Sequence, residues 1–204
     1  MIYIHNVKKS RKRLAKEYDN SVIINVSSKS KLPYLKLSPF YPHGNIPVPF
    51  SEGTYSESIE GIWQGLKVFD KFDIDTTKFS IRTMSGIKRP TRFYGKPLGH
   101  RKGVNGDLIN YLDARKLIYI PTYLWVLKNK ASDIISTIYK KALKKDIVLL
   151  DYTTNENIED LSKPLSHASL IKQLVIQMDP IKLNKKFSSE ESKKNNGQTK
   201  LNFE

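Results

Sequence analysis

Apolar residues recur at helical spacing in one central stretch of the chain, residues 58–70. The apolar positions of this stretch share one face of a helix: Ile59, Ile62, Leu66 and Phe69. Such a stripe is typical of an amphipathic helix packed on a core. The pattern therefore predicts a helix over residues 58–70.

The same helix carries a second, polar face. At about 100° per residue, Glu60, Gln64 and Lys67 fall in one row away from the apolar stripe. Gly61 and Gly65 lie between them, where each glycine costs about 1 kcal/mol relative to alanine, so we expect another part of the chain to approach the backbone closely there. Either the polar row lines a functional cleft, or it forms solvated contacts on a surface helix.

Patterns elsewhere predict further elements. Continuous apolar runs at residues 21–26 and 147–150 are typical of buried strands. Residues 33–50 hold five prolines and several aromatic residues, which favours an ordered loop that shapes a pocket or covers the core. Helical spacing predicts helices over residues 8–18, 107–115, 133–144 and 166–178. The apolar run 117–127 fits either a helix or a strand, with Pro121 a plausible helix start.

Length and composition place these elements in one domain. With 204 residues, 39% of them apolar, the chain can bury one sizeable core. We expect a single helix-rich α+β domain with a small β component over residues 1–179, followed by a disordered tail over residues 180–204. The absence of cysteine excludes disulfides and thiolate sites, and no apolar run suits a signal peptide or a membrane span. These features favour a soluble, cytoplasmic protein that does not contact membranes.

Positive charge is concentrated inside the folded part. The net charge is +15, and residues 76–106 carry eight Lys or Arg and no acid. Such a run favours a polyanionic partner, either nucleic acid or a phosphorylated small molecule, with Arg89 and Arg92 as candidate phosphate ligands. The alternative is a basic surface that keeps the protein soluble.

Other candidate chemistry is sparse. Asp151 follows the predicted strand 147–150, where polar residues often act, although it can equally cap a turn. Adjacent Ser166 and His167 do not form a nucleophile and base pair merely by being neighbours. The four histidines show no metal-ligand spacing and the glycines match no nucleotide-binding fingerprint, so we expect neither a metal nor a cofactor.

The last residues resemble a docking peptide. Gln198, Leu201 and Phe203 occupy the positions that bind sliding clamps in many bacterial and phage replication and repair proteins. A terminal apolar pair on a polar tether suits capture in a groove. We therefore expect a sliding clamp as a partner.

Three segments resemble the opening signature of the NADAR family (NAD- and ADP-ribose-associated proteins). They are residues 37–40 (Leu-Ser-Pro-Phe), residues 46–49 (Ile-Pro-Val-Pro) and residues 58–67, and residues 148–155 are similar to a later strand end of that family. Gly61 stands where the family usually has histidine. The resemblance implies an α+β domain that hydrolyses N-glycosidic bonds of ribose phosphates, including ADP-ribose attached to guanine.

The resemblance and the residues together define a hypothesis. We expect an N-glycosidase acting on ADP-ribosylated or phosphoribosyl-linked bases in nucleotides or DNA, with Glu60 and Asp151 as the catalytic carboxylates. A nearby cation should keep Glu60 ionised to meet a positive ribose. The expected substrate-binding residues are Phe40, Trp63, Gln64, Lys67, Arg89, Arg92 and Asn155. The alternative is a non-catalytic nucleic-acid-binding accessory protein that docks on a sliding clamp.

Overall fold

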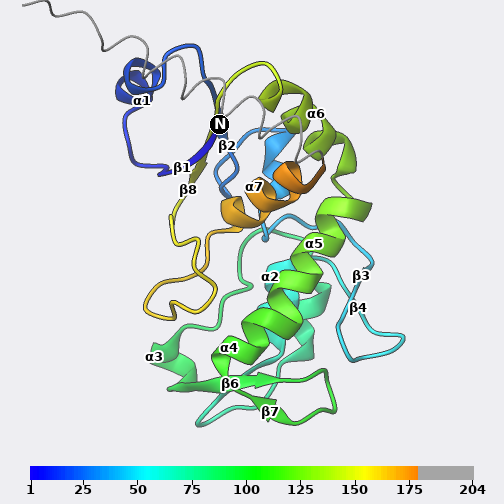
Figure 1. Cartoon of the computed structure of the whole chain (residues 1–204). Coiled ribbons are helices and arrows are strands. Elements are labelled where there is room, and N and C mark those ends of the chain that lie inside the picture. Colours follow the sequence, from blue (N-terminus) through cyan, green and yellow to red (C-terminus); the bar gives the residue numbers. More distant parts are fainter. Residues whose placement is uncertain (179–204) are drawn as a thin grey trace, which may run out of the picture.

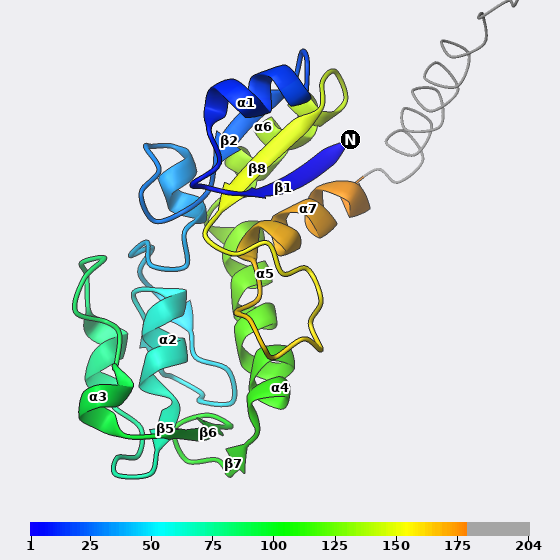
Figure 2. The same ribbon diagram turned by 90° about the vertical axis from the view of Figure 1, so that its left-hand side faces the viewer.

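A parallel three-stranded sheet lies at one end of the molecule. The computed structural model describes residues 1–178, and its strand order is β1 (Ile2–Asn6), β8 (Ile147–Asp151), β2 (Val22–Asn25). β8 is the central strand, paired in parallel with both neighbours, and all five of its residues are buried. Figure 2 shows β8 between β1 and β2. A run of consecutive apolar residues suits such a strand because both of its faces are covered.

Helices cover the two faces of this sheet. Because side chains alternate along a strand, Val148 and Leu150 point to one face, where they pack with Leu14 of α1 (Arg11–Glu17). Ile147 and Leu149 belong to the main core on the other face, which α6 (Ser132–Ala142) and α7 (His167–Met178) cover.

A long helical segment runs from the sheet toward the opposite end of the molecule (Figure 1). It consists of α4 (Tyr111–Ala114), the π-helical turn η3 (Arg115–Tyr119) and α5 (Ile120–Asn129). Pro121 has no N–H to donate to the preceding turn, and the wider π turn stands directly before it. Pro121 therefore lies near the start of α5 but inside a continuous helical segment.

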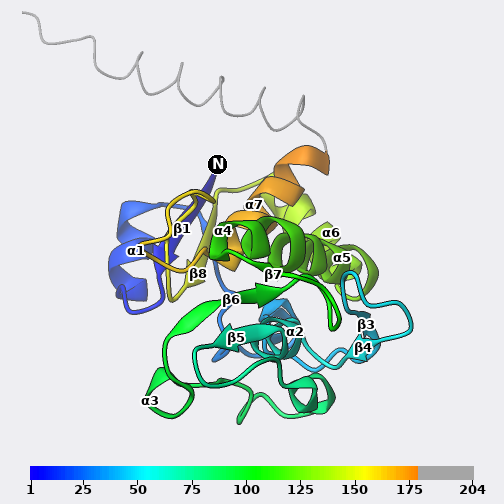
Figure 3. The ribbon, with the colours of Figure 1, turned by 90° about the horizontal axis from the view of Figure 1, so that it is seen from below.

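The remaining elements form the other end of the molecule. α2 (Ile59–Gly65) lies beside the long helical segment, and β5 (Lys67–Phe69), β6 (Pro97–Arg101) and β7 (Leu108–Ile109) form an antiparallel sheet next to it (Figure 3). The short elements of this part are η1 (Tyr34–Leu37), β3 (Ile46–Pro47), β4 (Tyr55–Ser56), η2 (Thr76–Ser80) and α3 (Thr91–Tyr94).

The α+β class is confirmed, and so are the two predicted strands and the helices α6 and α7. The predicted helix over residues 58–70 is too long, because α2 ends at Gly65 and residues 67–69 form β5. Donors from other segments satisfy the carbonyl groups at this end: Asp75 N–H donates to Gly65 O and Arg101 N–H donates to Leu66 O. The chain can therefore leave the helix without unpaired backbone groups.

The close approach expected at the two helix glycines is confirmed. A Cβ added at Gly61 would lie 2.7 Å from the carbonyl oxygen of Lys78. A Cβ added at Gly65 would lie 2.3 Å from Cε1 of Phe79. Neither position has room for a side chain, so these glycines let α2 pack directly against η2 and the segment around it.

Two sequence predictions lie outside this description. The tail over residues 180–204 and its clamp-like residues Gln198, Leu201 and Phe203 are not among the described residues, so clamp docking stays a prediction. In residues 1–178, no helix is long and apolar enough to cross a membrane.

Candidate functional site

A cleft of about 1060 Å³ opens between α2, the turn η3, the carboxyl end of β8 and the loop 84–91. This volume is just above the usual range for ligand pockets, which is about 300 to 1000 Å³. Figure 2 shows α2 beside the long helical segment, and lining residues of the cleft come from α2, from η3 and from the carboxyl end of β8. Its charged and aromatic lining residues are Phe40, Glu60, Trp63, Lys67, Lys88, Arg89, Tyr111, Arg115, Tyr119, Asp151, Tyr152 and His167.

Glu60 and Gln64 are joined on the α2 side of the cleft. Ser58 caps the helix by accepting a hydrogen bond from Gly61 N–H at 3.0 Å. One helical turn separates Glu60 from Gln64, whose Nε2 donates to Glu60 Oε1 at 2.8 Å. Both side chains are buried, so the row expected from the sequence is a cleft wall rather than a solvated surface.

The environment of Glu60 favours its protonated form. Burial raises the pKa of the Glu60 carboxyl, and the hydrogen bond from Gln64 with the charges of Lys67 and Lys88 opposes this rise without reversing it. Nearby cations were expected to outweigh burial and keep Glu60 ionised; they do lower this pKa, but desolvation is the larger effect and the net shift is upward. A carboxyl group of this kind can donate a proton to a ligand.

Two lysines bring positive charge to the same region. Lys67 begins β5 instead of ending α2, yet it still lies near Glu60, and its Nζ is 5.8 Å from the centre of the Trp63 ring. Burial lowers the pKa of Lys67, and the charge of Glu60 raises it in part. Lys88 is exposed and its Nζ lies 5.5 Å from the centre of the Phe40 ring. Both pairs join a cation to an aromatic face that a ligand can share.

Asp151 is the last residue of β8, and it also lines the cleft. Its Oδ2 accepts from Ser166 Oγ at 2.7 Å and lies 3.0 Å from His167 Nδ1, while its Oδ1 accepts from Tyr152 N–H at 2.7 Å. Burial alone would raise the pKa of Asp151, but the charge of His167 and the hydrogen bonds together lower it. The cleft thus contains one carboxyl group inclined to hold its proton and one inclined to lose it.

The turn η3 supplies a residue that sequence reasoning missed. Tyr119 is partly exposed in the cleft, and its ring centre lies 5.5 Å from that of Trp63. Burial raises the pKa of Tyr119 well above its ordinary value, and the charges of Glu60 and Asp151 add to the effect, so this hydroxyl stands near both acids. Among the described residues, the hydroxyl makes no hydrogen bond. π-helical turns are often found at functional sites, and Pro121 within the apolar run 117–127 was the available signal.

Three predicted substrate-binding residues are not placed to bind a ligand in the cleft. The guanidinium of Arg89 donates to the carbonyl oxygens of Lys67 at 2.6 Å and Asp73 at 2.8 Å, and it is buried between aromatic rings. Arg92 is exposed outside the cleft. Asn155 Nδ2 donates to Asp160 O and Lys163 O, so it organises a loop rather than the cleft wall. We therefore leave all three out of the candidate ligand site.

Arg115 has the same structural character as Arg89. Although it lines the cleft, its guanidinium donates to the carbonyl oxygens of Ile158, Asp160 and Lys163 at 2.7 to 3.1 Å. Arg115 and Asn155 thus hold the same loop, which leads from Asp151 to α7. Buried arginines that satisfy several carbonyl groups keep loops in one arrangement.

Trp63 rests on a buried histidine. The rings of Trp63 and His100 lie 3.8 Å apart between centres, and His100 is fully buried. Burial and the charge of Lys67 lower the pKa of His100 to about 3, while the Trp63 backbone raises it slightly, so the ring is neutral at physiological pH. His100 therefore acts as an apolar support for the cleft wall.

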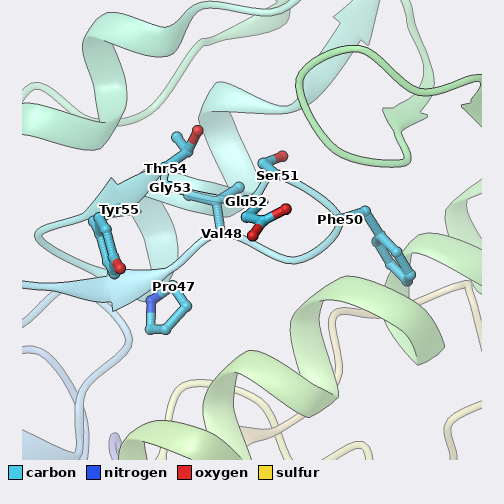
Figure 4. A pocket seen from close by; sticks show the side chains of 8 residues that line it. All are labelled: Pro47, Val48, Phe50, Ser51, Glu52, Gly53, Thr54 and Tyr55. Atoms are coloured by element: carbon cyan, nitrogen blue, oxygen red, sulfur yellow. The ribbon is translucent and has the colours of Figure 1, made fainter.

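A smaller hollow of about 420 Å³ lies at the β3–β4 hairpin. One loop, residues 47–55, supplies all of its lining, and Glu52 is its only charged side chain (Figure 4). Figure 4 shows Pro47 and Tyr55, the two ends of this loop, near each other, and Phe50 on the far side of the hollow from them. The hollow brings together no residues distant in sequence and offers no paired chemistry, so the larger cleft is the candidate site.

Within residues 1–178, no group of three or more His, Asp or Glu side chains is placed to hold a metal ion.

Comparison with known proteins corrects the resemblance to the NADAR family. The sequence pattern of a family of unknown function, DUF6939, matches residues 6–171, which include every segment that resembled NADAR, and no NADAR match is found. Short signatures such as Ser-Pro-Phe before a Ser-x-Glu helix start recur for local reasons, since serine caps helices in many folds. No curated protein matches the chain. Because the match covers most of the sequence, the chain belongs to the family of unknown function DUF6939.

Proposed function

We propose that the cleft hydrolyses the N-glycosidic bond of a ribosyl phosphate, with a phosphoribosyl-linked or ADP-ribosylated base as the substrate. The observation that carries the proposal is the pair of carboxyl groups that line one cleft from two elements, Glu60 of α2 with a raised pKa and Asp151 of β8 with a lowered one. Enzymes that cleave glycosidic bonds use two such groups in different protonation states.

Each group has a role that its environment supports. Protonated Glu60 donates its proton to the departing base nitrogen as the bond between that nitrogen and C1′ breaks. The Asp151 carboxylate stabilises the positive charge that develops on the ribose. Water then adds to C1′, and a proton from that water replaces the one that Glu60 gave. The net change is the addition of one water molecule across the glycosidic bond.

The rest of the cleft suits a nucleotide. Trp63 and Phe40 offer aromatic faces for a base, and each has a lysine beside it, Lys67 and Lys88, for phosphate oxygens. The volume of about 1060 Å³ accommodates a nucleotide with a second group attached.

The test measures release of free base by chromatography. The purified full-length protein is incubated with phosphoribosyl-linked bases and with guanine nucleotides and DNA carrying ADP-ribose. We expect base release by the wild type and a loss of about 100-fold or more in turnover for Glu60→Gln and for Asp151→Asn. Glu52→Gln, which changes a carboxylate in the smaller hollow, is the matched control and should keep full activity. No release from any substrate, or equal rates in all variants, would reject the proposal.

Nucleic-acid binding without catalysis is the second candidate. Four cations of the basic segment, Lys88, Arg92, Lys96 and Lys102, make no ion pair within residues 1–178. These exposed charges suit a phosphate backbone. The test titrates DNA at several salt concentrations: replacing Arg92 and Lys96 by Gln should weaken binding and reduce its salt dependence, and unchanged binding would count against this candidate.

A further inference from the structure

His167 has an unusual pair of neighbours. It is the first residue of α7, and its ring is buried. Nδ1 lies 3.0 Å from Asp151 Oδ2, and Nε2 lies 2.8 Å from the carbonyl oxygen of Val26, the residue after β2. A carbonyl oxygen can only accept a hydrogen bond, and so can an ionised carboxylate. Both ring nitrogens therefore face acceptors, and only the doubly protonated imidazolium can satisfy both.

The neighbours of Asp151 lead to the same conclusion. Three donors surround its two oxygens: His167 Nδ1, Ser166 Oγ and Tyr152 N–H. A carboxylate with three donors is stabilised in its ionised form, and a proton on Asp151 would have to displace one of them. The hydroxyl of Ser166 donates to Asp151 and not to His167, so these residues do not form a nucleophilic triad.

Opposing effects are present and are outweighed. Burial would lower the pKa of His167, but the charge of Asp151 and the hydrogen bonds to Asp151 and Val26 raise it. The N-terminus of α7 also disfavours a cation. The other titratable groups near the pair carry no compensating charge: Tyr123, whose ring centre lies 5.8 Å from that of His167, donates its hydroxyl to Leu37 O, and Tyr119 is neutral.

We propose that His167 is a positioning residue, held as an imidazolium, which keeps Asp151 ionised and fixed at the edge of the cleft. The catalytic consequence rests on the proposed function, whereas the ionic pair itself does not. In the proposed reaction, Asp151 must carry its charge when the ribose becomes positive. A neutral His167 would leave that charge without its partner on the sheet side of the cleft.

The first test observes the ring of His167 directly in the full-length protein. In ¹⁵N-labelled wild type at about neutral pH, both ring nitrogens of His167 should show imidazolium shifts, since both face hydrogen-bond acceptors. The signal is assigned in the wild type by through-bond correlation from the His167 backbone. His100, His43 and His5, whose pKa values burial lowers, are internal controls that should be neutral. A neutral His167 with one bare nitrogen would overturn the proposal, and this measurement requires no variant to fold.

The second test observes Asp151 through its ¹³C carboxyl shift. In His167→Gln, the midpoint of this titration should rise by about one pH unit or more, because the nearby positive charge is gone. His43→Gln should leave it unchanged. If the Asp151 midpoint does not move in folded His167→Gln, His167 only fills space and the proposal is overturned.

If the protein releases base, the acid limb of turnover should move to higher pH in His167→Gln. A protein that never releases base but shows both spectroscopic results would disprove the proposed function and leave the ionic pair established.

Discussion

Gln64 fixes the side chain of Glu60 in one orientation. Its Nε2 donates to Glu60 Oε1 at 2.8 Å, while its Oε1 accepts from the backbone N–H of Arg89 at 3.1 Å. The reversed amide would set its NH₂ group against an N–H group and its oxygen against a carboxyl oxygen, so the hydrogen-bond pattern determines which way Gln64 points. Within residues 1–178, Glu60 Oε2 has no hydrogen-bond partner, so it can carry the proton that the raised pKa favours.

Relative to the wild type, the Glu60→Gln variant should become more stable as pH rises. The pKa of Glu60 is higher in the folded state than its unfolded value of 4.5, so the unfolded state loses its proton first and wild-type stability falls as pH rises through this interval. Glu60→Gln removes this loss. Urea unfolding should therefore show Glu60→Gln gaining stability relative to the wild type as pH rises from about 4 to about 8. Glu52→Gln should show no such gain, and a Glu60→Gln protein less stable than wild type at high pH would contradict the raised pKa.

Replacing Gln64 by Leu should destabilise the protein. The change leaves the buried N–H of Arg89 without an acceptor and removes the donor to Glu60, at a cost of about 1 to 3 kcal/mol. Gln173→Leu, an exposed site on α7, should change stability by less than about 0.5 kcal/mol. Chemical denaturation of the three proteins checks this, and equal values would mean that the Gln64 hydrogen bonds contribute nothing.

Arg89 and Arg92 should respond very differently to the same change. Lysine cannot reproduce the fork of hydrogen bonds from the Arg89 guanidinium to Lys67 O and Asp73 O. We expect Arg89→Lys to lower the free energy of unfolding by roughly 2 to 3 kcal/mol, and Arg92→Lys to lower it by less than about 0.5 kcal/mol. Thermal unfolding measures both. If Arg89→Lys is as stable as the wild type, Arg89 again becomes a candidate ligand-binding residue.

Gly65→Ala should destabilise the protein although alanine favours helices. The new Cβ would lie 2.3 Å from Cε1 of Phe79, and such overpacking costs about 1 to 3 kcal/mol, more than the helix propensity gains. Shortening the neighbour should relieve the clash. The cost of Gly65→Ala, measured by urea unfolding, should therefore be smaller in a Phe79→Leu background than in the wild type. A Gly65→Ala single variant more stable than the wild type would show that the Phe79 ring moves away from the new Cβ without cost.

Tyr119→Phe should lower catalytic activity while leaving the stability of the protein nearly unchanged. The hydroxyl of Tyr119 makes no hydrogen bond among the described residues, so its loss should change stability by less than about 0.5 kcal/mol. If the cleft acts as proposed, a hydroxyl near both acids should contact the ligand, and kcat/KM should fall by about tenfold. Base release and thermal unfolding measured side by side check this. Unchanged kcat/KM in a protein with hydrolase activity would remove Tyr119 from the site.

The sequence by itself determined the elements whose signals are local. The apolar run 147–150 predicts the central strand and places Asp151 at its end, because a strand buried on both faces needs apolar residues at every position. The spacing of Glu60 and Gln64 joins them through helix geometry alone. The glycines of α2 predicted close packing correctly, since only contact with another segment justifies their cost.

Tertiary structure decided which charges remain free. The basic segment 76–106 has no acid of its own, yet Glu57, Asp73 and Asp75 from outside it pair with three of its cations. Sequence reasoning gave Arg89 and Arg92 the same role, and burial separates them. Sequence reasoning also assigned no role to His167, whose partners Val26 and Asp151 lie 141 and 16 residues away along the chain. Desolvation and long-range partners set the pKa of Glu60 and the charge of His167, and no local pattern encodes them, because both depend on which distant segments the fold packs together.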